Sequence, residues 1–288
     1  MKNIKSISDF MDKLKIVSKL FIRRYLNVQT AIGYLLANDP FRSLGLYPRI
    51  ITTPDGFKIY TRHIATLSIN IHDQYISREY EQHPEFIPKF GWTIFDIGAY
   101  IGIYSLHASR LIGKGIVIAF EPNPISYYWF KENIKLNNVT NVRILPIALG
   151  DRRGIIDFFI ITEGNIEAST VVKDHLLSGF LYNKYLKVAK VKVPVYTLDE
   201  IIHNYVPDKY VDLAKIDVEG SELSVLMGAK ESLKRKFIER LVIEVHKDII
   251  NSWELKKLLE KFNYKIVLEL DLGPLKSIIY AMNTSTSK

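Results

Sequence analysis

The stretch Thr93-Ile94-Phe95-Asp96-Ile97-Gly98-Ala99-Tyr100-Ile101-Gly102 decides the fold, and the run Val117-Ile118-Ala119-Phe120-Glu121-Pro122 follows after an amphipathic segment. The first apolar run is too short for a helix and stops at glycines, which predicts a buried strand that turns into a helix near Gly102. The second run predicts the next strand, with Glu121 at its carboxyl end. A strand, a glycine turn, a helix and a strand with a terminal acid form a βαβ unit that binds a ribose-bearing cofactor.

The residues of this turn favour one cofactor over another. A nicotinamide dinucleotide favours Gly-x-Gly-x-x-Gly, because its pyrophosphate needs bare backbone at a helix N-terminus. Only Gly98 and Gly102 occupy the turn, and Asp96 would repel a pyrophosphate. S-adenosylmethionine has a sulfonium, an ammonium and a ribose but no phosphate, so Asp96 suits its cationic end and Glu121 its ribose hydroxyls. The alternative interpretation is an ordinary strand-to-helix turn with a surface Glu.

The composition limits the class of protein. A chain of 288 residues with 48% hydrophobic and 12% aromatic residues predicts one large α/β core with an appendage. The absence of cysteine excludes disulfides, thiolate zinc sites and cysteine nucleophiles. No apolar run reaches the ~18 residues of a membrane span, and the N-terminus lacks a signal-like block. We therefore expect a cytoplasmic protein that is soluble or peripherally attached to a membrane.

The positive charge is concentrated at the N-terminus. The first 24 residues carry seven Lys or Arg against two Asp, which is five of the eight net positive charges. Residues 8–38 have the spacing of two helices, with Ser8 as an N-cap. Two interpretations stay open: a helical cap packed on the main domain, or an amphipathic helix on an anionic membrane.

The order of patterns predicts four regions. Residues 1–48 are a basic helical extension, and residues 49–92 contain a hairpin around Pro54-Asp55-Gly56 and a helical segment over 72–87 that covers the cofactor edge. Residues 93–282 form the cofactor-binding domain, and residues 283–288 a disordered tail. For 72–87, a solvated helix face is the alternative to contact with cofactor or substrate.

Within the main domain, a helix over 127–136 and a third strand over 142–148 are expected, and the turn Leu149-Gly150-Asp151 should flank the adenine. Strands are expected over 157–161 and 188–195. Residues 163–185 between them are too long for a simple connection, which predicts a lid or specificity insertion.

A second informative stretch is Leu213-Ala214-Lys215-Ile216-Asp217-Val218, followed by the turn Glu219-Gly220-Ser221-Glu222 and a helix. Leu241-Val242-Ile243-Glu244-Val245-His246 predicts another core strand. The carboxyl ends of parallel strands meet at one sheet edge, so Asp217 and Glu219 should lie beside Asp96 and Glu121.

Six blocks of the chain together resemble one known family, the FkbM family of S-adenosylmethionine-dependent methyltransferases. They are Phe95-Asp96-Ile97-Gly98-Ala99, Phe120-Glu121-Pro122-Asn123-Pro124, Ala148-Leu149-Gly150-Asp151, Thr197-Leu198-Asp199, Lys215-Ile216-Asp217-Val218-Glu219-Gly220 and Ile243-Glu244-Val245-His246. The resemblance covers about residues 50–282. It implies a Rossmann-like class I methyltransferase fold, α/β with a seven-stranded, mostly parallel sheet, and O-methylation of a sugar, glycan or secondary metabolite.

The resemblance also implies where the cofactor binds. Asp96, Gly98, Ala99 and Gly102 would surround its methionine end. Glu121, Pro122 and Asn123 would lie at the ribose, and Ala148, Leu149 and Asp151 at the adenine. Asp217 would lie near the transferred methyl group.

A hydroxyl acceptor must lose its proton as the new bond forms. His246 is the first candidate for the base because imidazole titrates near neutrality, and Asp217 is the second, with Glu219 and Glu244 as orienting groups. A purely structural role for His246 is the alternative. The acids could instead hold a divalent cation, although their spacing matches no dedicated metal motif.

Three competing functions remain at this stage. An RNA methyltransferase, with tRNA bound through the basic N-terminus, is the nearest, although cysteine-dependent base methylation is excluded. A cofactor-binding or membrane scaffold without catalysis is the second, and a dehydrogenase is the third. The identity of the acceptor, a lipid-linked one included, and the oligomeric state have no signal in the sequence.

Overall fold

The computed structural model describes residues 50–60, 70–163, 169–170 and 187–284. The helices expected over 8–38 and nearly all of the insertion expected over 163–185 lie outside these residues. Within the described ranges, no helix combines the length and the apolarity that a membrane span requires.

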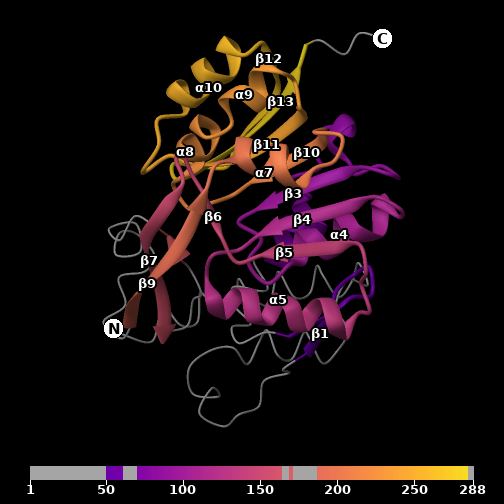
Figure 1. Ribbon diagram of the computed structural model, residues 1–288. Coiled ribbons are helices and arrows are strands. Elements are labelled where there is room, and N and C mark those ends of the chain that lie inside the picture. The colour runs from indigo at the N-terminus through magenta and orange to yellow at the C-terminus, as the bar shows by residue number, and fades with distance from the viewer. Residues whose placement is uncertain (1–49, 61–69, 164–168, 171–186, 285–288) are drawn as a thin grey trace, which may run out of the picture.

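A seven-stranded sheet forms the centre of the fold, in the order β12-β13-β11-β10-β3-β4-β5 (Figure 1). β13 is antiparallel to its neighbours, whereas the pairs from β11 to β5 are all parallel. Its strands are β3 (Thr93–Ile97), β4 (Ile116–Phe120), β5 (Val142–Leu145), β10 (Val211–Ile216), β11 (Ile238–His246), β12 (Tyr264–Asp271) and β13 (Lys276–Asn283). This is the seven-stranded, mostly parallel sheet that the sequence predicts.

Helices cover both faces of this sheet, because successive strand residues point to opposite sides. Phe95 packs in a core with the helices α7 to α10, and Ile94 packs in a second core with α4 and Phe130 of α5. The helices are α4 (Ile103–Ile112), α5 (Pro124–Leu136), α7 (Leu198–Tyr205), α8 (Glu222–Met227), α9 (Lys230–Lys234) and α10 (Ser252–Lys261). A capping box of Thr197 and Glu200 fixes the start of α7, as its sequence predicts.

The prediction of one strand over residues 142–148 is wrong in its second half. β5 ends at Leu145, and residues 148–149 form β6 (Ala148–Leu149), which pairs with β9 of a different sheet. Pro146 explains the break, because proline has no N–H to continue the ladder. The second sheet has the order β6-β9-β7-β8, with β7 (Gly154–Glu163), β8 (Ser169–Thr170) and β9 (Lys187–Tyr196).

The segment before β3 is fastened to the sheet domain at several points. It contains the hairpin β1 (Ile50–Thr52) and β2 (Lys58–Tyr60), the π-helical turn η2 (His72–Ser77) and the short 3-10 helix η3 (Pro84–Phe86). The ring of His107 on α4 lies between Asp55 and Glu81, at 3.0 and 2.9 Å. We call Asp55, Glu81 and His107 the clamp. It ties the hairpin and the residues after η2 to the helix that follows the glycine turn.

The C-terminal strand is longer than expected. β13 extends through Asn283, which is buried against the sheet and donates a hydrogen bond to the carbonyl of Ile238 at 3.3 Å. Asn283 therefore belongs to the sheet rather than to the tail predicted over residues 283–288.

Candidate active site

The turn after β3 has room only for glycine at two positions. Gly98 and Gly102 have φ values of 82° and 90°. A Cβ at Gly98 would lie 1.7 Å from the carbonyl oxygen of Asp217, and one at Gly102 would lie 2.1 Å from the ring of Phe130. Because neither contact is sterically possible, the two glycines let the turn approach the end of β10 on one side and α5 on the other.

Backbone hydrogen bonds join this turn to the end of β4. The amides of Gly98 and Ala99 donate to the carbonyl of Phe120 at 3.0 and 3.1 Å. The amide of Tyr100, which has φ 51°, donates to Oε2 of Glu121 at 2.7 Å. The two carboxyl ends that the sequence predicts as neighbours are thus held together.

Glu121 is buried, and its carboxylate accepts hydrogen bonds from two backbone amides, those of Tyr100 and Asn123. Oε1 accepts from the amide of Asn123 at 2.8 Å, and the side chain of Asn123 in turn caps α5, at whose start Pro122 and Pro124 lie. Burial raises the pKa of Glu121 to about 8. A carboxylate has about four acceptor positions, so Glu121 retains capacity for two ribose hydroxyls.

Asp96 is paired with a cation of the protein itself. It is fully buried, accepts a hydrogen bond from Ser105 at 2.6 Å, and lies 3.2 Å from Nζ of Lys215. The register of β3 and β10 places Asp96 directly beside Lys215. Lys215 also donates to the carbonyl of Gly98 at 3.1 Å and lies 3.3 Å from Oδ2 of Asp217. The sequence predicts that Asp96 faces a cationic group of the ligand, whereas the structure places the ammonium of Lys215 beside it.

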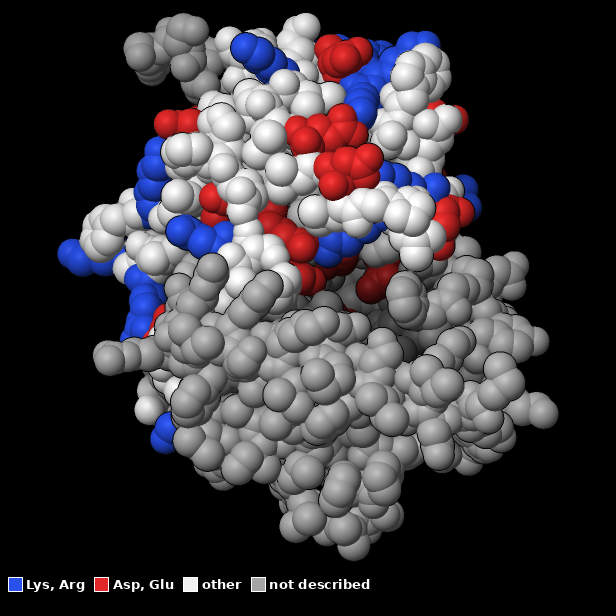
Figure 2. Space-filling view, turned by 180° about the vertical axis from the view of Figure 1, so that it is seen from behind, with Lys and Arg blue, Asp and Glu red and all other residues white. Residues whose placement is uncertain are grey.

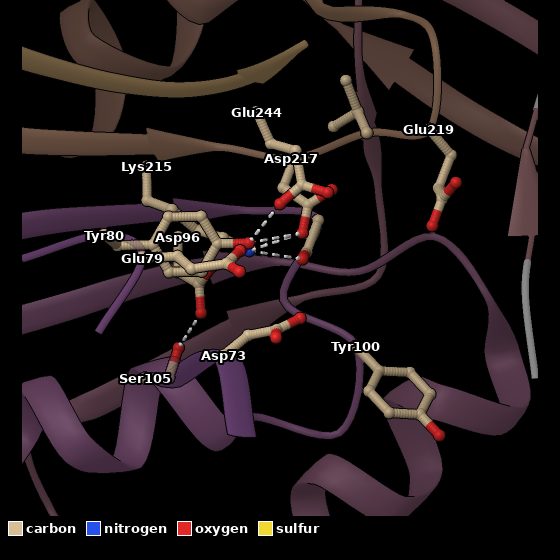
Figure 3. Close-up of polar contacts among 12 residues, drawn as sticks. Asp73, Glu79, Tyr80, Asp96, Tyr100, Ser105, Lys215, Asp217, Glu219 and Glu244 are labelled. Carbon is tan, nitrogen blue, oxygen red and sulfur yellow. Dashed lines mark hydrogen bonds and ion pairs between the residues drawn. The ribbon is translucent and has the colours of Figure 1, made fainter. Parts of the chain in front are cut away.

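Carboxylates gather at the carboxyl edge of the sheet. Asp217 follows β10, Glu244 lies on β11, and Tyr80, from the segment before β3, reaches both (Figure 3). Burial and the neighbouring charge of Asp217 raise the pKa of Glu244 to about 7. Figure 2 shows acidic side chains gathered on the face seen from behind. An edge of this charge suits a cationic ligand.

His246 is held between two other acids. Its Nδ1 lies 2.8 Å from Oε1 of the fully buried Glu222, and its Nε2 lies 3.3 Å from Oε2 of Glu219. Burial lowers the pKa of His246, but its hydrogen bonds with Glu219 and Glu222 outweigh this effect and raise the pKa to about 12. The imidazole is therefore protonated at neutral pH in this arrangement.

One group at this edge has the spacing of metal ligands. An oxygen of Asp217, an oxygen of Glu219 and a ring nitrogen of His246 all lie within 4.8 Å of one another. A divalent cation could bridge these atoms if it displaced the proton of His246. The paired charges of His246 and Glu219 account for the same arrangement without a metal.

The turn expected at the adenine lies against α8. Ala148 and Leu149 are buried in β6, whereas Asp151 is exposed and its amide donates to the hydroxyl of Ser224 at 3.1 Å. A Cβ on Gly228 would lie 2.0 Å from the carbonyl oxygen of Gly150. This close packing fixes the turn beside the helix that follows Asp217 and Glu219.

Lys215 has no role in the sequence-based interpretation, whereas Tyr80 lies in the segment 72–87 that the sequence predicts at the cofactor edge, without naming the acids it contacts. A lysine inside the apolar run 213–216 is the signal for a buried counter-ion, since an unpaired ammonium would be too costly to bury. Tyr80 has no such signal, because its partners are 137 and 164 residues away in the chain.

The residues present fit S-adenosylmethionine. Glu121 offers acceptor capacity to a ribose, and the edge carries carboxylates for a sulfonium and an ammonium.

Comparison with known proteins agrees with this chemistry. Residues 96–266, more than half of the chain, match the model of the Methyltransferase FkbM domain. The chain is 27% identical to Methyltransferase 1 of Beauveria bassiana over 76% of this chain and 90% of that protein. It is 28% identical to Methyltransferase sdnD of Sordaria araneosa over 60% of this chain and 73% of that protein.

Among solved structures, an S-adenosylmethionine-dependent methyltransferase from Aquifex aeolicus aligns with a TM-score of 0.41 and 17% identity, over 68% of this chain and 84% of that one. The match to the family model covers the glycine turn, Glu121, the acids of the sheet edge and His246 together. The chain belongs to the FkbM-domain methyltransferases and is an enzyme that uses S-adenosylmethionine.

Proposed function

We propose that this enzyme methylates a hydroxyl oxygen of a sugar, glycan, lipid-linked or secondary-metabolite acceptor. The observation that carries the proposal is Glu244, a buried carboxylate at the sheet edge whose pKa is raised to about 7. A group with a pKa near the working pH is suited to accept the proton that a hydroxyl loses during transfer. Bound S-adenosylmethionine supplies an activated methyl group, so alignment and proton removal are the tasks left to the protein.

In this proposal the cofactor-binding residues have separate tasks. Gly98, Ala99 and Gly102 shape the turn at the methionine end, and Asp96 acts through its pairing with Lys215. Glu121 accepts from the ribose hydroxyls, while Pro122 and Asn123 fix its position at the start of α5. Ala148, Leu149 and Asp151 form the wall at the adenine. Asp217 lies at the end of β10, next to the point of transfer.

The assignment of the base differs from the expectation from the sequence. His246 is protonated at neutral pH because Glu219 and Glu222 hold its proton, so it lacks the free lone pair that a base needs. We therefore assign proton acceptance to Glu244 and an orienting role to His246, which lies 3.9 Å from the Glu244 carboxylate. Asp217 is the second candidate base. Its Oδ2 lies 3.3 Å from Nζ of Lys215.

The charge of the edge bears on the acceptor. Two ammonium groups lie at this cluster, those of Lys215 and Lys276, and both contact carboxylates. Phosphate-rich acceptors would meet repulsion at this point, which favours a neutral acceptor over RNA.

Calorimetric titration of S-adenosylmethionine and S-adenosylhomocysteine tests the cofactor site. Wild type should bind both at micromolar concentration, and Glu121→Gln and Glu121→Ala should weaken binding by about 100-fold, the loss expected for two hydrogen bonds to a carboxylate. Glu132→Ala, at a half-buried position on α5 whose carboxylate pairs with Lys135, is the matched control, and NADH is the control ligand. Unchanged binding in both Glu121 variants would refute the assignment of this residue.

A screen with radiolabelled methyl donor then tests the acceptor class. Glycans, lipid-linked sugars, small hydroxylated metabolites and tRNA are offered to wild type and to Glu244→Gln. Transfer to a hydroxyl that falls in Glu244→Gln while cofactor binding persists supports the proposal. Transfer to tRNA alone would replace it with the RNA alternative.

A further inference from the structure

Tyr80 contributes a hydroxyl to the sheet edge from outside the residues that match the family model. It lies between η2 and η3, ahead of the residues 96–266 that match the family model. Its side chain is buried, and its hydroxyl lies 2.7 Å from Oε2 of Glu244 and 3.1 Å from Oδ2 of Asp217. One phenol thus contacts both carboxylates that are candidates for the base.

The backbone on each side of Tyr80 is fixed to a different element. Lys276 of β13 lies 2.7 Å from the carboxylate of Glu79, and the hydroxyl of Tyr280 donates to the Glu79 carbonyl. On the other side, Glu81 belongs to the clamp with His107. These contacts hold the segment to β13 and α4 at once, so the position of the Tyr80 side chain follows from the tertiary structure around it.

The ring of Tyr80 is also oriented by its neighbours. It packs edge to face against Tyr104, with ring centroids 5.7 Å apart, and the ammonium of Lys215 lies 5.2 Å from the centre of the Tyr80 ring. A ring held by an aromatic contact and a cation has little freedom to swing away. Figure 3 shows the Tyr80 hydroxyl directed at Asp217 and Glu244.

The single proton of the Tyr80 hydroxyl decides which of the two carboxylates receives a hydrogen bond. A phenol has one proton, so Tyr80 can donate to only one of the two carboxylates at a time. Asp217 has a second partner in Lys215, at 3.3 Å, whereas the contact of Tyr80 with Glu244 is the shorter one. Donation to Glu244 stabilises its ionised form, and burial of Tyr80 beside two acids keeps the phenol itself protonated.

We propose that Tyr80 is a positioning residue for methyl transfer, whose hydroxyl holds the Glu244 carboxylate beside Asp217 and favours the ionised form that can accept a proton. This inference rests on the proposed role of Glu244 as the base. When Glu244 takes the proton of the acceptor hydroxyl, the proton of Tyr80 can turn to Oδ2 of Asp217.

The test measures the titration of Glu244 directly. Protein labelled with ¹³C at the glutamate carboxyl carbons is titrated by NMR, and Glu244→Gln identifies the signal. Tyr80→Phe should raise the pKa of Glu244 by about one, the size expected for loss of a hydrogen bond to a carboxylate. Tyr104→Phe is the matched control, because its buried hydroxyl has no hydrogen-bond partner among the described residues.

A second measurement tests the same inference without the Tyr80→Phe variant. Incorporation of 3-fluorotyrosine at position 80 strengthens the donor without changing the ring packing, so the pKa of Glu244 should fall. If Tyr80→Phe does not fold, this opposite shift alone decides the question. A Glu244 titration that is the same in wild type and in the fluorinated protein would overturn the inference.

Cofactor titration of the same samples separates this inference from the proposed function. Tyr80→Phe should bind S-adenosylmethionine within about twofold of wild type, because Tyr80 contacts acids of the transfer point rather than Glu121. The acceptor screen completes the separation. A shifted Glu244 pKa together with hydroxyl methylation that persists in Glu244→Gln would support the contact and refute the proposed role of Glu244. An unshifted pKa together with hydroxyl methylation that falls in Glu244→Gln would refute the inference and leave the proposed function standing.

Discussion

Two histidines of this enzyme, His107 and His246, each lie between two carboxylates, yet their surroundings differ. His107 contacts Asp55 and Glu81, which come from the hairpin and from the segment after η2. His246 contacts Glu219 and Glu222, which belong to the single turn that leads into α8. The first set joins three distant parts of the chain, and the second lies at the edge where the parallel strands end.

The surroundings decide the role of each set. In the clamp, Asp55 also accepts from Tyr75 at 2.8 Å and Glu81 from Arg78 at 2.7 Å, so its acids have protein donors on several sides. At the sheet edge, Asp217 and Glu244 lie next to His246 and share one phenol. A histidine between acids is therefore no sign of catalysis by itself, and the neighbouring acids that share a donor are the more informative feature.

The largest effect should come from removing the cation beneath the edge. Lys215→Met leaves Asp96 fully buried with the hydroxyl of Ser105 as its remaining hydrogen-bond donor among the described residues, and should lower the free energy of unfolding by about 3–5 kcal/mol. Urea denaturation measures this loss. Lys230→Met, an exposed change on α9, is the control. Adding Asp96→Asn to Lys215→Met should restore part of the stability, and a stable Lys215→Met protein would contradict the account of this pair.

The next effect concerns the clamp and depends on pH. Burial lowers the pKa of His107, but Asp55 and Glu81 raise it to about 9, above the value of about 6.5 in the unfolded chain. The stabilisation is therefore complete below about pH 6.5 and is lost as the pH rises through about 9. It corresponds to about 3 kcal/mol.

Comparison of wild type with His107→Gln isolates this contribution. The difference in unfolding free energy between the two proteins should shrink between about pH 6 and about pH 9, measured by urea denaturation at each pH. Cofactor binding should stay the same in the variant, because His107 contacts the acids of the clamp and the ring of Tyr75 rather than Glu121 or the acids of the sheet edge. A difference that is constant over this range would show that His107 is neutral in the folded protein.

The smallest effect should come from a single hydroxyl of the clamp. Tyr75→Phe removes the hydrogen bond to Asp55 and should lower the free energy of unfolding by about 1 kcal/mol. Unlike Tyr80→Phe, it should leave the titration of Glu244 unchanged. Tyr128→Phe, at an exposed position on α5, serves as the control for thermal and urea denaturation. If Tyr75→Phe shifted the Glu244 titration, the clamp and the edge would not be separate units.

Local patterns were sufficient for much of the fold. The strand, turn and helix from Thr93 to Gly102, the acid at the end of β4 and the strands before Asp217 and His246 follow from short-range spacing, because period and punctuation are local properties. The strand expected over 142–148 failed at Pro146, where an apolar run continues but the hydrogen-bond ladder cannot.

The sequence by itself determined the family, the sheet and the cofactor, since these depend on glycines and acids at fixed positions along neighbouring strands. Tertiary structure alone decided that Asp96 is neutralised by Lys215, that His246 holds a proton between two acids, and that Tyr80 joins Asp217 to Glu244. The physical reason is that a pKa and a proton position depend on burial and on charges brought together across the fold, and no local spacing encodes these.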